Sequence, residues 1–414
     1  MTVHPYPVSP PSASPGHPPP LELLAANPAC PATVLARCVA DPDPAVRRAA
    51  AAHPAARPWL EGFAGAEDWR VRAAVAANSA CPHRLWATFA RDPEPRVRAA
   101  VARTAPFGRP LHGRLAADPV PEVRAAAAAH PDCDAAFLDR ALDDPADAVR
   151  DTALKHPACP PGRLADAVTR SALWFRITVA AHPASPGAVL ARLAADEHDE
   201  VRAALARNPA APAAVLDVLA GDLDPWVAAA ALRAPALPAR RLERAAGHAD
   251  PRLRAAVAGH PRCPLPLLTA LAADPSSQVR RAVAGHPDCP ADVLGALAAD
   301  LGVRDRVARN PRCPAPLLRG LAGTVPVAVA RNPRCPPGLL RRLARHPEAG
   351  VRAVAARHPH CLVGTQLRLT ADEHGEVRAA LALTSPHPVV LARLAATAPR
   401  TRPVRTAQPS RRPA

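Results

Sequence analysis

The strongest constraint on this fold is a sequence pattern that returns about every 26 residues. Residues 260–285 read HPRCPLPLLTALAADPSSQVRRAVAG, and the pattern begins again at His286. A fixed period between 20 and 50 residues is typical of repeat arrays, in which each unit buries its apolar face against its neighbours. Each unit opens with an anchor residue that is followed by proline or a small residue. The anchors are Asn27, His53, Asn78, Thr104, His130, His156, His182, Asn208, Ala234, His260, His286, Asn310, Asn332, His358 and Thr384.

The repeats predict one elongated array of about fourteen units rather than two or three globular domains. Hydrophobic residues make up 49% of the chain but aromatic residues only 3%, so alanine, leucine and valine must fill the core. Such small side chains let short helices approach to roughly 8–10 Å between their axes.

Each unit encodes two short helices. Pro264 suits position N1 of the first helix, because proline has the required φ and wastes no donor. Asp274 is a good N-cap and Pro275 a good N1 for the second helix. That helix must end at Gly285, since Pro287 forces His286 out of the α region. The predicted buried positions are Leu267, Leu268 and Leu271 in the first helix and Val279, Ala282 and Val283 in the second.

The array is predicted to span residues 21–396. Residues 21–26 supply the last turn of an incomplete unit, and residues 384–396 supply the first half of another. Residues 1–20 are rich in proline and serine and residues 397–414 in arginine and proline, so both segments are predicted to be disordered.

The repeat unit resembles the leucine-rich repeat variant family, and its half written DPxxxVRxAVA resembles HEAT-type repeats. The resemblance implies an all-α, right-handed α-solenoid of two-helix repeats, either α/α or α/3₁₀. The founding member of the family carries an N-terminal cysteine cluster for an iron–sulfur centre. This chain has no cysteine before Cys30 and no tight CxxC set, so no cofactor is expected.

Nine of the ten cysteines occupy one register, three residues after the anchor. Equivalent positions lie one repeat apart, roughly 10 Å, whereas the Cα atoms of a disulfide lie about 4.4–6.8 Å apart. We therefore expect buried free thiols in a reducing cytoplasm. The nine are Cys30, Cys81, Cys133, Cys159, Cys263, Cys289, Cys313, Cys335 and Cys361, and Cys38 stands alone.

The anchors are mostly His and Asn, as at His260 and His286, and we expect them to bond backbone groups at helix ends rather than a metal. An arginine such as Arg280 lies six residues after Asp274, and most units repeat this spacing. HEAT-like repeats carry a similar ladder of Asp–Arg pairs between units, which suits the forked guanidinium. A ligand-facing arginine row is the alternative.

Two acidic segments, residues 196–200 (DEHDE) and 372–376 (DEHGE), have the composition of metal sites. Both fall where the second helix begins, and acids there favour the helix dipole. The sequence contains no nucleophile elbow, phosphate-binding loop or HExxH motif. We therefore predict no metal, no catalytic residues and no enzyme activity.

The net charge is +16, and residues 300–360 contain twelve arginines but only three acidic residues. Several of these arginines flank the anchors, and they predict a basic edge at the turns that suits phosphates. An ordinary solvated edge is the alternative. The candidate binding residues are Arg262, Arg309, Arg312, Arg331, Arg334 and Arg357.

The sequence has no secretory leader and no apolar run of 18 residues, so we expect a monomer in the bacterial cytoplasm with no membrane contact. The predicted function is a non-catalytic scaffold for a protein or peptide partner. The alternative is nucleic-acid binding through the basic edge at 300–360. Few aromatic residues accompany that edge, so base stacking is not expected.

Overall fold

The computed structural model describes residues 21–106, 109–169 and 173–397, and every regular element in these ranges is a helix. The segments 1–20 and 398–414, which were predicted to be disordered, lie outside the described residues. The chain divides into two compact units. Unit 1 comprises residues 1–106 and 341–414, and unit 2 comprises residues 107–340.

Unit 2 consists of two-helix repeats. Its helices are α8 (Arg109–Ala116), α9 (Pro121–Ala128), α10 (Ala135–Ala141), α11 (Asp147–Lys155), α12 (Pro161–Thr169), α13 (Leu173–Ala181), α14 (Gly187–Leu193), α15 (Asp199–Ala206), α16 (Ala213–Leu219), α17 (Pro225–Ala231), α18 (Ala239–Ala246), α19 (Pro251–Ala258), α20 (Leu265–Leu271), α21 (Ser277–Gly285), α22 (Ala291–Leu297), α23 (Arg304–Arg309), α24 (Ala315–Leu321), α25 (Pro326–Ala330) and α26 (Pro337–Leu343), the last of which runs into unit 1.

Unit 1 combines repeats from opposite ends of the sequence. Its helices are α1 (Leu21–Ala25), α2 (Ala32–Val39), α3 (Pro44–Ala52), the 3₁₀-helix η1 (Pro54–Trp59), α4 (Leu60–Phe63), α5 (Trp69–Ala76), α6 (His83–Phe89), α7 (Pro95–Thr104), α27 (Ala349–Arg357), α28 (Val363–Leu369), α29 (Gly375–Thr384) and α30 (Pro388–Thr397).

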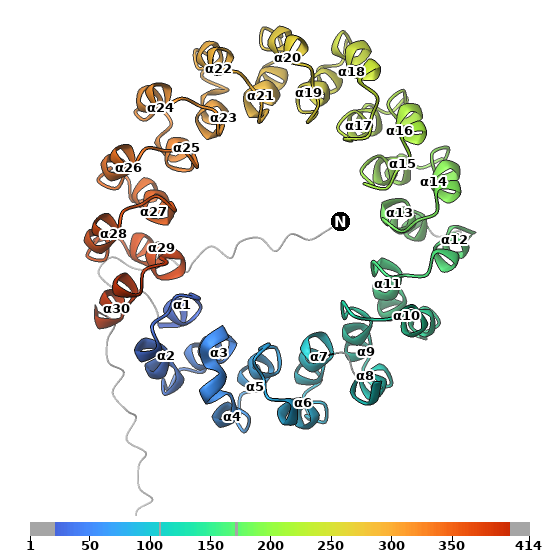
Figure 1. Cartoon of the computed structure of the whole chain (residues 1–414). Coiled ribbons are helices and arrows are strands. Elements are labelled where there is room, and N and C mark those ends of the chain that lie inside the picture. Colours follow the sequence, from blue (N-terminus) through green and yellow to red (C-terminus); the bar gives the residue numbers. More distant parts are fainter. Residues whose placement is uncertain (1–20, 107–108, 170–172, 398–414) are drawn as a thin grey trace, which may run out of the picture. The chain divides into compact units, whose positions relative to one another are not determined.

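The helices of each unit form two layers (Figure 1). In each regular repeat an even-numbered first helix packs on the odd-numbered second helix that follows it. Within a unit, second helices also pack on the second helix of the next repeat, as α19 does on α21 and α21 on α23. This arrangement confirms the predicted all-α solenoid of two-helix repeats.

Helix boundaries differ from the prediction by one or two residues. The Pro264 carbonyl accepts the N–H of Leu268 (2.9 Å), so Pro264 is the residue before α20 and not its N1 position. Asp274 is not the N-cap of α21, and Pro275 is not its N1. Asp274 bonds the N–H of Ser276 in a local turn (2.8 Å), and Ser276 is the N-cap. The predicted stop at Gly285 is confirmed, because His286 has extended backbone at φ −68° and ψ 131°.

Four of the six predicted apolar positions in this unit are buried. Leu268, Leu271, Val279 and Val283 are shielded from solvent, whereas the predicted Leu267 and Ala282 are only half-buried. The two exceptions lie at the margins of the apolar stripe of their helices.

Two anchors lie one residue later than the pattern indicated. Thr104 and Thr384 are the last residues of α7 and α29, and the extended backbone falls on Ala105 and Ser385. Each of these two residues precedes a proline, which excludes the α region for it.

Both helices of a repeat are α-helices, and η1 is the single 3₁₀-helix in the described ranges. The α/3₁₀ alternation that the resemblance allowed is therefore wrong for this chain, apart from η1. Pro54 and Pro58 in η1 lack N–H donors, which accounts for its departure from α-helical bonding. Nowhere in the described ranges is a helix long and apolar enough to cross a bilayer.

Candidate functional site

The histidine anchors bond two repeats together. Nε2 of His286 lies 3.0 Å from the carbonyl oxygen of His260, one repeat earlier, and Nδ1 of His286 accepts the N–H of Asp288 at 3.0 Å. A nitrogen that accepts an N–H carries no proton, so Nε2 must carry it and donate it to the carbonyl. His286 is therefore a neutral imidazole of one tautomer. Burial lowers the pKa of His182 and of His260, which favours the neutral ring in both.

The asparagine anchors form the same ladder with one more bond. Asn310 donates from Nδ2 to the carbonyls of Ala284 (2.8 Å) and His286 (2.9 Å), and its Oδ1 accepts the N–H of Arg312 (2.8 Å). Asn78, Asn208 and Asn332 have corresponding donor bonds to the preceding repeat. These side chains satisfy carbonyls that a helix end leaves without a partner, so they are structural.

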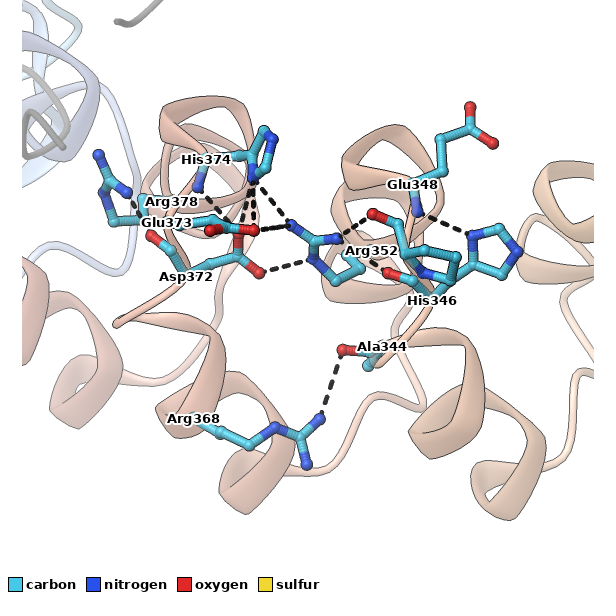
Figure 2. Close-up of polar contacts among 10 residues, drawn as sticks. Ala344, His346, Glu348, Arg352, Arg368, Asp372, Glu373, His374 and Arg378 are labelled. Atoms are coloured by element: carbon cyan, nitrogen blue, oxygen red, sulfur yellow. Dashed lines mark hydrogen bonds and ion pairs between the residues drawn. The ribbon is translucent and has the colours of Figure 1, made fainter. Parts of the chain in front are cut away.

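A second ladder joins arginine and aspartate side chains twenty residues apart. Arg280 donates from Nη1 to the carbonyl of Asp274 in its own repeat (2.8 Å) and from Nη2 to the carboxylate of Asp300 in the next (2.6 Å). Figure 2 shows the same geometry at Arg352, whose guanidinium lies between the His346 carbonyl and the Asp372 carboxylate. The pairs of this ladder are Arg72–Asp92, Arg124–Asp144, Arg176–Asp196, Arg202–Asp222, Arg254–Asp274, Arg280–Asp300 and Arg352–Asp372.

Pairing with arginine lowers the pKa of most aspartates of the ladder. The hydrogen bond from Arg254 lowers the pKa of Asp274. At Asp372, burial alone would raise the pKa, but the bonds from Arg352 and the His374 N–H outweigh it and lower the value. A carboxylate that accepts two or three such bonds is a poor general base, because the bonds stabilise its ionised form and lower its affinity for a proton.

The cysteine register is buried throughout. Cys263, Cys289 and Cys313 belong to the set of ten free thiols, all of them shielded from solvent. Burial raises the pKa of each of these three thiols to about 11. A thiol is a weak nucleophile until it ionises, so these residues are poorly suited to catalysis at neutral pH.

The two acidic segments take part in the arginine ladder. Asp196 pairs with Arg176 at 2.9 Å and Asp372 pairs with Arg352 at 2.8 Å. In the described part of the chain, no group of three or more His, Cys, Asp and Glu side chains is arranged to hold a metal ion.

The arginines that the sequence assigned to a basic edge lie mostly in unit 2. Arg262, Arg309, Arg312, Arg331 and Arg334 are all exposed there, and Arg357 is exposed in unit 1. Arg312 differs from the others because it pairs with Asp288 of the preceding repeat at 2.6 Å. Within the described ranges, the other four arginines of unit 2 have no carboxylate partner.

Sequence reasoning missed a hollow of about 340 Å³ in the second-helix layer of unit 2. Helices α19, α21 and α23 contribute to it, and Gly259 and Gly285 open it by presenting no side chain. The Arg306 guanidinium lies directly over Gly285, in space that a Cβ would occupy. Arginine residues 233, 281 and 306 line the hollow, and they are candidate binding residues that the repeat pattern did not single out. The available signal was glycine in the position before two successive anchors.

The charges around the hollow are only partly compensated. Arg281 pairs with Asp305 at 2.8 Å and donates to the Gly302 carbonyl. Neither Arg233 nor Arg306 has a carboxylate partner among the described residues. Burial, and then the charge of Arg207, lower the pKa of Arg233, as expected for a cation that lacks a counter-ion. The hollow therefore offers two guanidinium groups to an anion.

An apolar spot lies in the same layer, at the turn where α17 begins. Leu223 is fully exposed and Trp226 is 64% exposed, and most repeats have a polar residue at the position of Trp226. The Arg252 guanidinium lies 5.0 Å from the centre of the Trp226 ring. Tryptophan and arginine are the residue types that most often dominate the energy of protein interfaces.

Comparison with curated protein sequences gives no match. The family model of the leucine-rich repeat variant matches residues 278–302. Among solved structures, the chain is similar to a leucine-rich repeat variant with a novel repetitive structural motif, at 26% identity over 49% of this chain and 81% of that chain, with a TM-score of 0.35. It is also similar to a chain of a Kap95p–RanGDP complex, at 13% identity over 82% of this chain and 52% of that chain, with a TM-score of 0.25.

An engineered protein is similar at 14% identity over 88% of this chain and 98% of that chain, with a TM-score of 0.22. The matched segment 278–302 contains most of α21 and all of α22, so it covers the second helix of one repeat and the first helix of the next. The chain is a helical solenoid, and its segment 278–302 matches the leucine-rich repeat variant model.

Proposed function

We propose that this chain is a non-catalytic repeat scaffold that binds a protein or peptide rich in acidic residues. The observation that carries the proposal is the arginine hollow of unit 2, where Arg233 and Arg306 have no carboxylate partner among the described residues. Guanidinium groups bind carboxylates through two parallel hydrogen bonds, and the ladder of this chain already uses that geometry.

The size and surroundings of the hollow favour a peptide. Its volume of about 340 Å³ accommodates one or two side chains rather than a helix. The exposed Leu223 and Trp226 lie in the same layer and would contribute apolar contact area to a partner. Affinity at protein interfaces comes largely from a few such aromatic and arginine positions.

The polar side chains of the repeats support a non-catalytic role. The aspartates of the ladder are paired with arginines, and the thiols at Cys263, Cys289 and Cys313 have a pKa of about 11. The histidine anchors use both ring nitrogens in backbone contacts, as His286 does. These groups are therefore committed to folding and offer no activated base or nucleophile.

Nucleic-acid binding is the second candidate, and the exposed Arg262, Arg309, Arg331 and Arg334 favour it. Contacts of this kind neutralise phosphates without reading bases, so they would give salt-dependent binding that is uniform across sequences. The described residues of this edge include no aromatic side chain on which a base would stack.

A displayed library of random peptides would test the proposal. We expect the recovered peptides to be enriched in Asp and Glu. We expect the double variant Arg233→Gln/Arg306→Gln to bind these peptides at least about tenfold more weakly, as for the loss of charged hydrogen bonds. Arg319→Gln is the matched control, because Arg319 is an exposed arginine on the first-helix layer of the same unit.

Two results would contradict the proposal. One is recovery of peptides without acidic enrichment, and the other is equal binding by the hollow variant and the control. The nucleic-acid alternative is tested in parallel with labelled duplex DNA and single-stranded RNA. It predicts a steep salt dependence that becomes shallower when Arg309, Arg312, Arg331 and Arg334 are changed to serine.

A further inference from the structure

Two helices from opposite ends of the described sequence each form half of a repeat. Helix α30 occupies the first-helix position after α29, and it packs on α28 and α29. Helix α1 occupies the second-helix position before α3, since it packs on α3 as other second helices pack on their successors. Both helices belong to unit 1.

The two half-repeats contact each other and the same neighbours. Helix α1 packs on α30, as a second helix does on its own first helix, and it also packs on α29, the preceding second helix (Figure 1). Leu24 in α1 and Leu391 and Leu394 in α30 are fully buried. A helix of five residues is too short to be stable alone, so α1 depends on this packing.

The anchor ladder continues across this contact. Asn27 donates from Nδ2 to the carbonyls of Ala382 (2.8 Å) and Ser385 (3.1 Å). Asn78 makes the matching bonds to Ala51 (2.8 Å) and His53 (2.9 Å) in the repeat before it. Ser385 is the anchor of its repeat, as His53 is of its own. Asn27 therefore bonds Ser385 as though residue 27 followed it by one repeat.

The first-helix layer shows the same continuity. Arg37 in α2 donates to the Ala395 carbonyl near the end of α30 at 3.1 Å. In the regular pair α26 and α28, Arg368 donates to the Ala344 carbonyl at 3.4 Å (Figure 2). The arginine–aspartate ladder alone is interrupted, because Leu21 holds the position of its arginine. Arg47 bonds the Asp41 carbonyl, but the Asp41 carboxylate has no arginine partner among the described residues.

We propose that α30 and α1 are the two halves of one shared repeat, formed within a single molecule. This shared repeat is an interaction surface whose occupant is the chain's own segment 21–27. Filling it removes two apolar repeat faces that would otherwise need polar capping units. The shared repeat involves none of the arginines of the hollow, so its test is independent of the test of the proposed function.

Asn27→Ala tests the shared repeat, with Asn78→Ala as the matched control. Because both asparagines make two bonds to the preceding repeat, we expect similar decreases in the midpoint of urea unfolding. Amide exchange in α29 and α30 should become at least about tenfold faster in Asn27→Ala, as for the loss of buried hydrogen bonds. An effect of Asn27→Ala confined to α1 and α2 would overturn the proposal, and so would no effect.

A concentration series separates one molecule from two. If the contact forms within a molecule, the protein stays monomeric by light scattering and its unfolding midpoint does not change with concentration. If α1 of one copy fills the site of another, the midpoint rises with concentration. That outcome overturns the intramolecular assignment.

A circular permutant provides an independent test. In the regular repeat, Asp274 holds the position equivalent to Thr397 and Arg280 the position equivalent to Leu21. Residues 275–279 (PSSQV) lie between these two positions. A permutant joins Thr397 to Leu21 through Pro-Ser-Ser-Gln-Val and opens between Gly247 and His248, an exposed turn between first and second helix. Five linking residues span at most about 20 Å. We expect a folded monomer with an unchanged or higher unfolding midpoint, and failure to fold when the wild-type order folds overturns the proposal.

Discussion

The arginine ladder leads to a quantitative prediction at its most buried pair, Arg352 and Asp372. The two side chains are 9% and 7% exposed and lie 2.8 Å apart. Arg352→Met removes the cation and leaves the Asp372 carboxylate with the hydrogen bond from the His374 N–H. Removing one partner of a buried pair costs about 3–5 kcal/mol. Since Met fills part of the arginine's volume, we expect a loss of about 3 kcal/mol.

The control is the pair Arg312–Asp288, which is shorter at 2.6 Å but 52% exposed on both sides. Arg312→Met should cost less than about 0.5 kcal/mol, because solvent screens an exposed pair. Repeat arrays do not unfold in one step, so the assay is amide exchange resolved by helix, with urea unfolding alongside. Equal costs for the two variants would refute the reasoning, since burial would then not decide the strength of the pair.

The same variant changes the dependence of stability on acid. The folded-state pKa of Asp372 is lowered, so its contribution is present above the unfolded pKa of about 3.9 and is lost as the pH falls through the folded value. Arg352→Met removes the main cause of that shift. Its stability should therefore fall less steeply than that of the wild type below about pH 4.

Two further predictions follow from the buried titratable groups. Because burial lowers the pKa of His182, its contribution to stability is present above the unfolded pKa of about 6.5 and is lost as the pH falls through the folded value. His182→Asn should keep the ladder and give a smaller drop in urea midpoint between pH 7.5 and 5; an unchanged drop would contradict this. Cys289 has a pKa of about 11, so only about one thiol in a thousand is ionised at pH 8. It should react with a thiol reagent only after unfolding, and rapid labelling of the native protein would contradict this.

The repeat pattern predicted most of the fold because each local signal agreed with the next. A proline after the anchor sets the end of one helix, as Pro287 does for α21. The arginine lies six residues after the aspartate position of its own repeat, and the repeat is 26 residues long. The Arg254 guanidinium therefore lies beside Asp274 of the next repeat, twenty residues later. The boundaries were less certain, because Asp274 can cap a helix or close a turn, and it closes the turn.

The hollow and the shared repeat depend on contacts that a single repeat does not encode. The hollow needs glycine at 259 and 285 together with Arg306, which enters from the next repeat. No periodic pattern shows that these three positions meet. The halves at residues 21–26 and 384–396 were visible in the sequence, but their pairing joins residues 355 apart. Local propensity carries no information over that separation.

The two ladders have different tolerance to irregular repeats, and this difference explains where the free arginines lie. Around Asn310 the spacing shortens, Arg304 bonds only the Ala298 carbonyl of its own repeat, and Thr324 stands where the next aspartate belongs. The ion-pair ladder therefore stops, but Asn310 still donates both bonds to the preceding repeat. Stacking there relies on backbone carbonyls, which do not depend on charge. Arg304 therefore has no aspartate partner in the next repeat, and Arg306, two residues further in the same helix, enters the hollow.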